Sequence, residues 1–291
     1  MPEMPPQIFD RRQRRLCRAR AADKIDSHGF LFDHAVKEIL ENLSMVTREF
    51  SSVLQIGLRP YALDIAHVGM DVSPLLCRGS RSVVADEDFL PFASGSFDLI
   101  ISPLSLHSVN DLPGALIQIR RTLKPDGLFL AAIFGGETLY QLRDALGQAE
   151  MELTGGLSPR LFPFADLPQM ASLMQRAGFT LPVADSEKIT VTYPSLTKMM
   201  HDLRYMGENN ILTQRRKTIP SRRLFSRAEE IYREIYAEHD GRLPATFEII
   251  YLTGWSAHDS QQKPLRPGTA QHSLAEALET EEITTGDTAQ P

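Results

Sequence analysis

The sequence predicts an α/β protein built on a doubly wound, mostly parallel sheet with helices on both faces. Short apolar runs alternate with segments of helical periodicity between residues 52 and 134. Strands that alternate with helices pair in parallel, because each helix supplies the crossover to the next strand. The composition agrees: 42% hydrophobic and 23% charged residues exclude disorder, collagen or a coiled coil as the main architecture of the 291 residues.

The predicted strands are short apolar runs that end at a polar residue or a turn. They cover residues 52–56, 66–70, 82–85, 97–101 and 128–134, and the last follows a predicted turn at 124–127. Apolar residues at helical spacing predict helices over residues 30–43, 112–123, 137–153 and 167–177. Two further strands are expected at residues 183–191 and 247–255.

Composition divides the chain into three parts. Residues 1–45 are expected to form a helical N-terminal segment, and residues 46–258 the sheet domain. Residues 194–245 are too long for a hairpin loop and have helical patterns, which predicts a helical insertion before the last strand. Residues 259–291 are acidic and poor in apolar side chains, so we expect a disordered tail.

Two basic clusters stand out in a chain of net charge −6. Solvated helix faces are the favoured interpretation, and a docking surface for an acidic partner is the alternative. Neither cluster is interleaved with the aromatic side chains that single-stranded nucleic-acid binders use, so no nucleic acid is expected as a partner. The clusters are Arg11, Arg12, Arg14, Arg15, Arg18 and Arg20, and Arg215, Arg216, Lys217, Arg222, Arg223 and Arg227.

Hydropathy, the N-terminal composition and the number of cysteines bear on cellular location and metal content. No apolar run approaches the ~18 residues that span a bilayer, and the acids among the first thirty residues argue against a transit peptide. These features predict a cytoplasmic protein. Two cysteines, Cys17 and Cys77, are too few for a four-cysteine zinc site or a disulfide scaffold, and no metal site is expected.

Polar residues at the carboxyl ends of the predicted strands are the first candidates for a site, because open α/β sheets bind ligands there. Asp71 and Asp86 each follow a strand, where a carboxylate accepts hydrogen bonds from hydroxyl or amino groups of a ligand. The alternative is that Asp71 or Ser73 caps the next helix. His107 follows the fourth strand as a candidate base; the alternative is a hydrogen bond to the turn at residues 110–111.

Several segments resemble class I S-adenosylmethionine (SAM) dependent methyltransferases of the type 11 group. Residues 85–92, 96–102 and 123–130 carry this resemblance. A second set is similar to the branch of the mitochondrial complex I assembly factor described as an arginine hydroxylase: residues 104–113, 134–143, 206–210, 231–236 and 243–247. The malonyl-carrier-protein methyltransferase of biotin synthesis is a more distant relative.

The resemblance implies a fold, a cofactor and a partner. The fold is Rossmann-like with an antiparallel last strand, and the cofactor is SAM. The residues that match the family's cofactor contacts are Gly57, Asp71, Asp86, Glu87 and Ser102, and His107 is the candidate catalytic residue. The partner is a subunit of respiratory complex I, which would hold the protein peripherally at the inner membrane.

The first loop departs from the family's pattern. Gln55 stands where the family has an acid, and Arg59 and Tyr61 stand where it has small residues. The connection to the next strand is also short for a parallel crossover and contains Pro60. A degenerate cofactor loop leaves three functions open: modification or chaperoning of a complex I subunit, methyl transfer to a small molecule or carrier-bound acid, and non-catalytic assembly.

Overall fold

The computed structural model describes residues 7–58, 63–262 and 273–280. The chain divides into two compact units, Met1–His258 and Asp259–Pro291. Within its described residues the second unit contains a short helix, α8 (Leu274–Ala277). The predicted disorder of the tail falls largely on residues 263–272 and 281–291, which lie outside the described residues.

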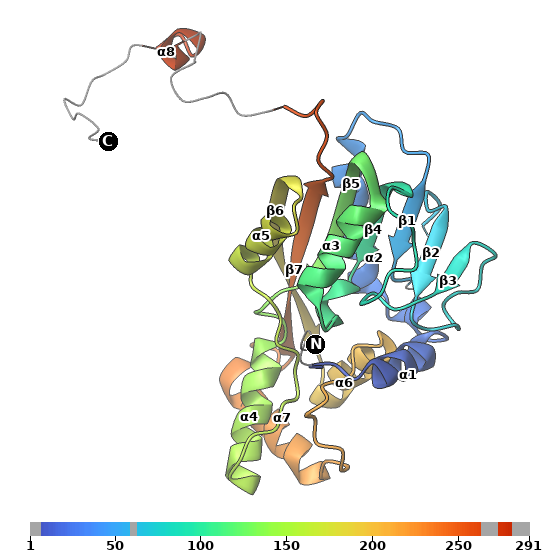
Figure 1. The fold of residues 1–291 in the computed structure, drawn as a ribbon. Coiled ribbons are helices and arrows are strands. Elements are labelled where there is room, and N and C mark those ends of the chain that lie inside the picture. Colours follow the sequence, from blue (N-terminus) through green and yellow to red (C-terminus); the bar gives the residue numbers. More distant parts are fainter. Residues whose placement is uncertain (1–6, 59–62, 263–272, 281–291) are drawn as a thin grey trace, which may run out of the picture. The chain divides into compact units, whose positions relative to one another are not determined.

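A seven-stranded sheet in the order β3-β2-β1-β4-β5-β7-β6 forms the centre of the first unit (Figure 1). Strand β7 runs antiparallel to its two neighbours, and the other pairs of strands are parallel. The predicted fold class, a mostly parallel sheet with an antiparallel last strand, is therefore confirmed. The strands are β1 (Val53–Ile56), β2 (Val68–Asp71), β3 (Ser82–Val84), β4 (Phe97–Pro103), β5 (Leu123–Phe134), β6 (Thr180–Tyr193) and β7 (Leu243–Trp255).

Helices cover both faces of the sheet because successive strand residues point to opposite sides. In β4, Leu99 and Ile101 pack with α2 (Phe30–Ser44), whereas Ile100 packs with α3 (Leu112–Thr122) and α5 (Leu167–Arg176). The predicted segments at 30–43, 112–123 and 167–177 are thus helices with nearly the expected bounds.

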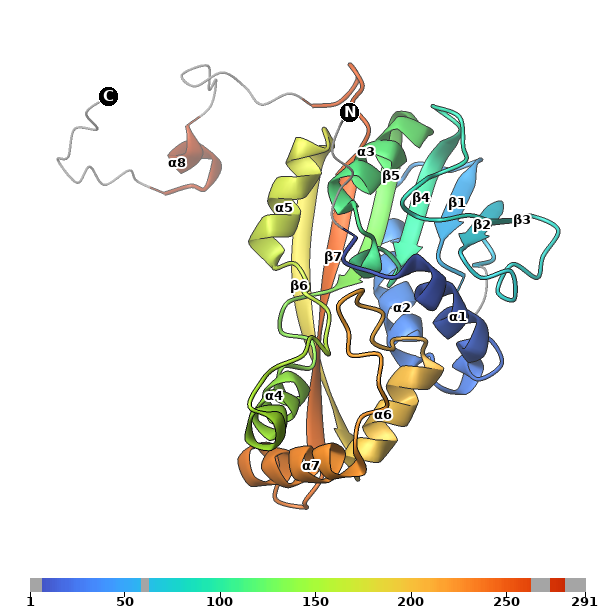
Figure 2. The same ribbon diagram turned by 60° about the horizontal axis from the view of Figure 1, so that its bottom comes forward.

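The insertion between β6 and β7 forms two helices, α6 (Leu196–Tyr205) and α7 (Arg222–Tyr236). Figure 2 shows α7 beside α4 (Tyr140–Thr154) at the far end of the long strands β6 and β7, with α6 nearer to α1 (Arg11–Ala21). The insertion thereby covers the end of the sheet toward which the parallel strands run.

Helix α4 begins later than the sequence pattern predicts. Residues 137 and 138 were expected in its first turn, but the segment Gly135–Leu139 first bonds along β7. The Gly135 and Glu137 amides donate to the Glu248 backbone oxygen and carboxylate, and Leu139 then has a φ of 55°. This pairing spans more than a hundred residues, so no local pattern reveals it.

Candidate functional site

Three acids gather where β2 and β3 end. Asp71 is the last residue of β2, and Asp86 and Glu87 follow β3 in a turn. Asp71 and Glu87 are almost fully buried, with 0% and 1% of their surfaces exposed. Buried carboxylates need partners, because an unpaired charge in the interior is costly.

The partners are arginines of α1, which lies at this edge beside α6 (Figures 1 and 2). The helix begins at Asp10, whose carboxylate caps it by accepting from the Gln13 amide. Arg11, Arg14 and Arg18 are spaced by three and four residues and therefore share one helix face.

Arg18 forms the deepest of these contacts. Its guanidinium lies 2.7 Å from a carboxylate oxygen of Asp71, and only 1% of the Arg18 surface is exposed. The Leu58 amide donates to the same Asp71 oxygen over 3.1 Å, and the Ser73 amide donates to the other oxygen over 2.8 Å. Asp71 thus organises the turn after β2. The alternative role as a helix cap is wrong, because residues 72–80 form turns and bends.

Glu87 binds two arginines of α1. Its carboxylate lies 3.1 Å from Arg14 and 2.7 Å from Arg11, and it accepts a 2.6 Å hydrogen bond from the Ser105 hydroxyl. Burial alone would raise the pKa of Glu87, but Arg14, Arg18 and Arg11 together hold that pKa well below its usual range. Glu87 is therefore ionised at neutral pH.

Arg11 completes the cluster at its outer side. It bonds the Asp86 carboxylate through Nε and a terminal nitrogen, and its Nε lies 3.3 Å from Asp88. Burial alone would lower the pKa of Arg11, but Glu87, Asp86 and Asp88 together keep it above its ordinary value. We call the three arginines and the acids Asp71, Asp86, Glu87 and Asp88 the arginine–carboxylate cluster.

The expectation that the first basic cluster is a solvated face is wrong for half of it. Arg12, Arg15 and Arg20 are exposed, but Arg14 and Arg18 lie on the buried face together with Cys17 and Ala21. A helix whose arginines share a face with apolar residues was the signal in the sequence. The second cluster is mostly exposed, although Arg215 pairs with Asp10 and Arg227 with Glu152.

The short crossover after β1 is organised by the Gln55 side chain, which is fully buried. Its amide nitrogen donates to the Gly57 carbonyl over 3.0 Å, and its oxygen accepts from the Leu63 amide over 2.6 Å. Gly57 has a φ of 89°, and a Cβ there would lie 2.7 Å from the Ser105 Cβ. Leu58 packs over Gly69 of β2. The departures at Arg59, Pro60 and Tyr61 lie outside the described residues.

These contacts test whether SAM fits the edge. The acids that the resemblance assigns to the cofactor, Asp71, Asp86 and Glu87, are bonded to α1, and Gly57 lies against Ser105. In this arrangement the residues present do not fit the cofactor. Ser102 lies fully buried in β4, and its hydroxyl finds no hydrogen-bond partner among the described residues. The cofactor roles of these residues stay predictions.

His107 lies in a single turn of 3₁₀ helix, Leu106–Ser108, directly after β4. Its Nε2 atom lies 3.1 Å from the Glu208 carboxylate, in the segment that follows α6. Asn110, the predicted alternative partner, bonds Phe9 and Asp88. The imidazole also lies within 4.8–6.4 Å, between ring centres, of Phe134, Phe162 and Phe164. His107 thus joins the sheet edge to the insertion.

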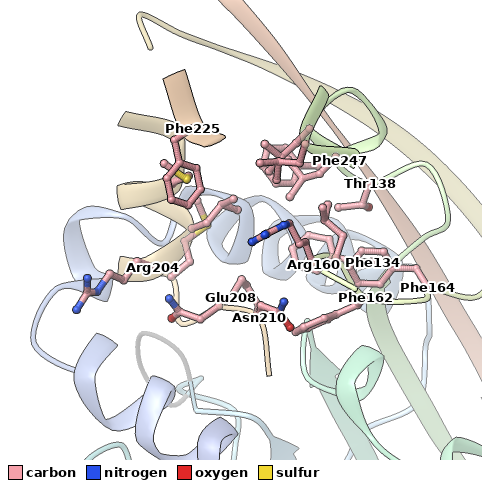
Figure 3. Close-up of a pocket in the computed structure, with 18 residues that line it drawn as sticks. Phe134, Thr138, Arg160, Phe162, Phe164, Arg204, Glu208, Asn210, Phe225 and Phe247 are labelled. Carbon is pink, nitrogen blue, oxygen red and sulfur yellow. The ribbon is translucent and has the colours of Figure 1, made fainter. Parts of the chain in front are cut away.

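A cavity of about 310 Å³ lies between β5, α4 and the insertion (Figure 3). Phe134, Phe162, Phe164 and Phe247 line it, with Glu208 and Arg160 as charged groups. In Figure 3 the Arg204 guanidinium points away from the labelled rings. Sequence reasoning missed Arg160, Phe162 and Glu208 as site residues; Glu208 lies in the 206–210 segment that carries the family resemblance.

Arg160 is neutralised by a buried acid of α4. Its guanidinium lies 2.7 Å from the Glu150 carboxylate, which also accepts from the Ser158 amide and hydroxyl. Burial would raise the pKa of Glu150, but Arg160 and Ser158 lower it to about 2. Glu208 is the carboxylate among the residues that line the cavity, and it contacts His107.

Comparison with known proteins identifies the class of this fold. The sequence family described as a methyltransferase domain matches residues 37–131. A solved structure described as a putative methyltransferase from Bacillus halodurans matches with a TM-score of 0.50, covering 76% of this chain and 100% of its own, at 11% identity. The chain is a protein of the class I methyltransferase fold.

More specifically, it belongs to the family of the arginine-hydroxylase NDUFAF5. The mitochondrial arginine-hydroxylase NDUFAF5 of Danio rerio is 37% identical over 286 residues, which cover 92% of this chain and 89% of the relative. Its Mus musculus counterpart is 40% identical over 293 residues, 95% and 85% of the two chains. The malonyl-[acyl-carrier protein] O-methyltransferase of Halorhodospira halophila is 32% identical over 277 residues, 88% and 92%. The predicted resemblances are confirmed.

The described residues also show whether the requirements for a membrane span and for a metal site are met. Among the described residues, no helix is long and apolar enough to cross a bilayer. The same residues contain no cluster of three or more histidine, cysteine, aspartate or glutamate side chains arranged to hold a metal ion.

Proposed function

We propose that this protein recognises an arginine side chain of a respiratory complex I subunit in the cavity beneath the insertion. The observation that carries the proposal is the Glu208 carboxylate in an aromatic cavity, held by His107. The name of the family's relatives, arginine-hydroxylase, supports arginine as the target.

The cavity has the chemistry that a guanidinium requires. A cation gains from the faces of aromatic rings, and from a carboxylate that accepts its hydrogen bonds. Phe134, Phe162 and Phe164 supply the rings, and Glu208 supplies the carboxylate. A volume of about 310 Å³ lies at the lower end of the range for ligand pockets and is large enough for one side chain.

Three cations lie near this occupant, and none of them directs an uncompensated charge at the rings. Arg204 lines the cavity but is exposed, and its guanidinium points away from the labelled rings in Figure 3. Arg160 is paired with Glu150, and Arg14, beyond the His107 side, is paired with Glu87. His107 contacts Glu208 but does not line the cavity, so we assign it as a positioning residue that orients the carboxylate. This assignment replaces the expected role of His107 as a catalytic base.

The binding test uses Nα-acetyl-L-arginine methyl ester as the probe, measured by titration calorimetry. Glu208→Gln preserves the shape of the side chain and a hydrogen bond to His107 but removes the charge. We expect it to weaken binding about tenfold, which corresponds to ~1.4 kcal/mol for one charge-assisted interaction.

Two controls accompany this variant. The citrulline analogue of the probe has the same shape without the charge, and should bind the wild type no better than Glu208→Gln binds arginine. Glu137→Gln removes an exposed carboxylate that pairs with Lys188, outside the cavity, and should leave the affinity unchanged. Equal binding of arginine and citrulline would remove the basis of the proposal.

The partner would dock on the insertion, because the second basic cluster is exposed there. At physiological salt, the attraction between exposed charges more than about 8 Å apart is largely screened, and added salt shortens this distance further. The association should therefore be salt-sensitive. Arg216→Glu with Lys217→Glu reverses two exposed charges and spares Arg215, which pairs with Asp10.

The partner test is affinity purification from cell extract at low and high salt. Complex I components should be recovered with the wild type at low salt, and less with the reversed variant. Recovery of none at low salt would argue against this partner. A position at the inner membrane then follows from the partner, and the cytoplasmic location stays a prediction.

A further inference from the structure

We propose that helix α1 takes the place of the SAM cofactor in this protein: its arginines are the partners of the strand-end acids, so the docked helix and SAM exclude one another. The inference concerns the arginine–carboxylate cluster and is independent of the proposed arginine cavity.

The first argument is that donors of the protein itself bond both carboxylate oxygens of Asp71. Arg18 and the Leu58 amide bond one carboxylate oxygen, and the Ser73 amide bonds the other. A ligand hydroxyl that approaches the oxygen shared by Arg18 and the Leu58 amide has to displace one of these two donors. Because a buried Arg18 separated from its carboxylate is costly, displacement requires that α1 leave the edge.

The second argument is that the helix reaches both acidic positions at once. Arg18 contacts Asp71 at the end of β2, while Arg11 contacts Asp86 and Glu87 after β3. Seven residues, about two turns of helix, separate the two arginines, so the helix spans both positions. A molecule held by Asp71 and by Asp86 together would occupy the place of these two side chains.

The third argument is the packing around Ser105. Its hydroxyl bonds Glu87 and accepts from Arg18 over 3.2 Å, and its Cβ closes against Gly57. The loop glycine, the acids and α1 are thus joined through one small side chain. This is the packing of a structural core, in which the acids serve stability in the absence of any ligand.

The thermal stability of the ligand-free protein distinguishes two roles of Asp71: a structural partner of Arg18, and an acid that serves to bind a ligand. Where an acid serves to bind a ligand and lies near other acids, replacing it by a neutral residue relieves repulsion. The stability of the ligand-free protein is then unchanged or raised. Here Asp71→Asn leaves the buried Arg18 without its carboxylate. We expect the thermal midpoint to fall by roughly 6–20 °C, the shift that corresponds to losing one partner of a buried ion pair.

Matched variants separate this effect from general damage. Asp64→Asn changes an exposed acid of the same crossover and should leave the midpoint unchanged. Adding Arg18→Met to Asp71→Asn removes both charges, and should recover much of the loss because an apolar side chain tolerates burial. A midpoint unchanged or raised by Asp71→Asn overturns the proposal.

The second experiment uses the full chain and needs no variant. SAM is titrated by calorimetry up to millimolar concentration, and amide hydrogen exchange of α1 is followed in parallel. We expect either no binding with α1 protected, or binding accompanied by faster exchange in residues 11–21. Binding of SAM while α1 stays protected overturns the proposal even where Asp71→Asn fails to fold.

Discussion

Replacing Glu150 by glutamine should destabilise the protein through the loop that forms one wall of the cavity. The carboxylate is 2% exposed and bonds the Ser158 amide, the Ser158 hydroxyl and two nitrogens of Arg160. Glutamine keeps one acceptor oxygen and loses the charge. Losing about two of these bonds, and the charge that strengthens them, costs roughly 2–3 kcal/mol. The thermal midpoint should fall by about 4–12 °C.

The dependence on pH gives a second measurement of the same contact. The pKa of Glu150 is about 2 in the folded protein, below its usual value of 4.5. A lowered pKa means that the carboxylate stabilises the fold above pH 4.5, and that this contribution is lost as the pH falls toward 2. The difference between wild type and Glu150→Gln should therefore shrink across that interval in calorimetric scans.

The control for this prediction lies on the same helix. Glu152→Gln removes an exposed carboxylate that pairs with Arg227 at the surface, and surface pairs contribute little. Its midpoint should stay close to that of the wild type. Equal midpoints for wild type and Glu150→Gln at neutral pH would refute the reasoning that Glu150 holds the loop at residues 158–160.

Two further predictions test other parts of the chain. Gly57→Ala combines a φ of 89° with a Cβ placed 2.7 Å from Ser105, and should cost about 1–3 kcal/mol in urea unfolding; an unchanged midpoint would mean that the loop relaxes freely. Deleting residues 261–291 should leave the thermal midpoint within about one degree, because the first unit contains the sheet and its covering helices; a larger fall would show that the second unit contributes to the stability of the first.

The sheet was predictable because each strand has a local sequence pattern. Buried parallel strands such as Val53–Ile56 and Phe97–Pro103 are apolar runs, and the amphipathic periodicity of α3 gave its bounds to within a residue. Local patterns failed where a distant residue decides the conformation. The start of α4 depends on Glu248, and nothing near residue 137 indicates that partner.

The candidate site was predictable in part, for the same reason. Asp71 and Asp86 were identified from their place after strands, and the structure brings both to one edge. Their partners were missed, because Arg18 is 53 residues from Asp71 in the chain and arginines are usually solvated. Glu208 and Arg160 were missed as site residues because each becomes part of the cavity only through contacts between separate elements.

The Gln55 amide makes residue 55 difficult to replace, because its side chain bonds residues on both sides of the short crossover. An amide both donates and accepts, and Gln55 uses both properties, toward the Gly57 carbonyl and the Leu63 amide. A glutamate at this position retains the acceptor but, when ionised, repels the Gly57 carbonyl. Gln55→Glu would therefore lose the hydrogen bond to the Gly57 carbonyl. An amide at residue 55 is thus required by both of its contacts, and a carboxylate satisfies only the Leu63 amide.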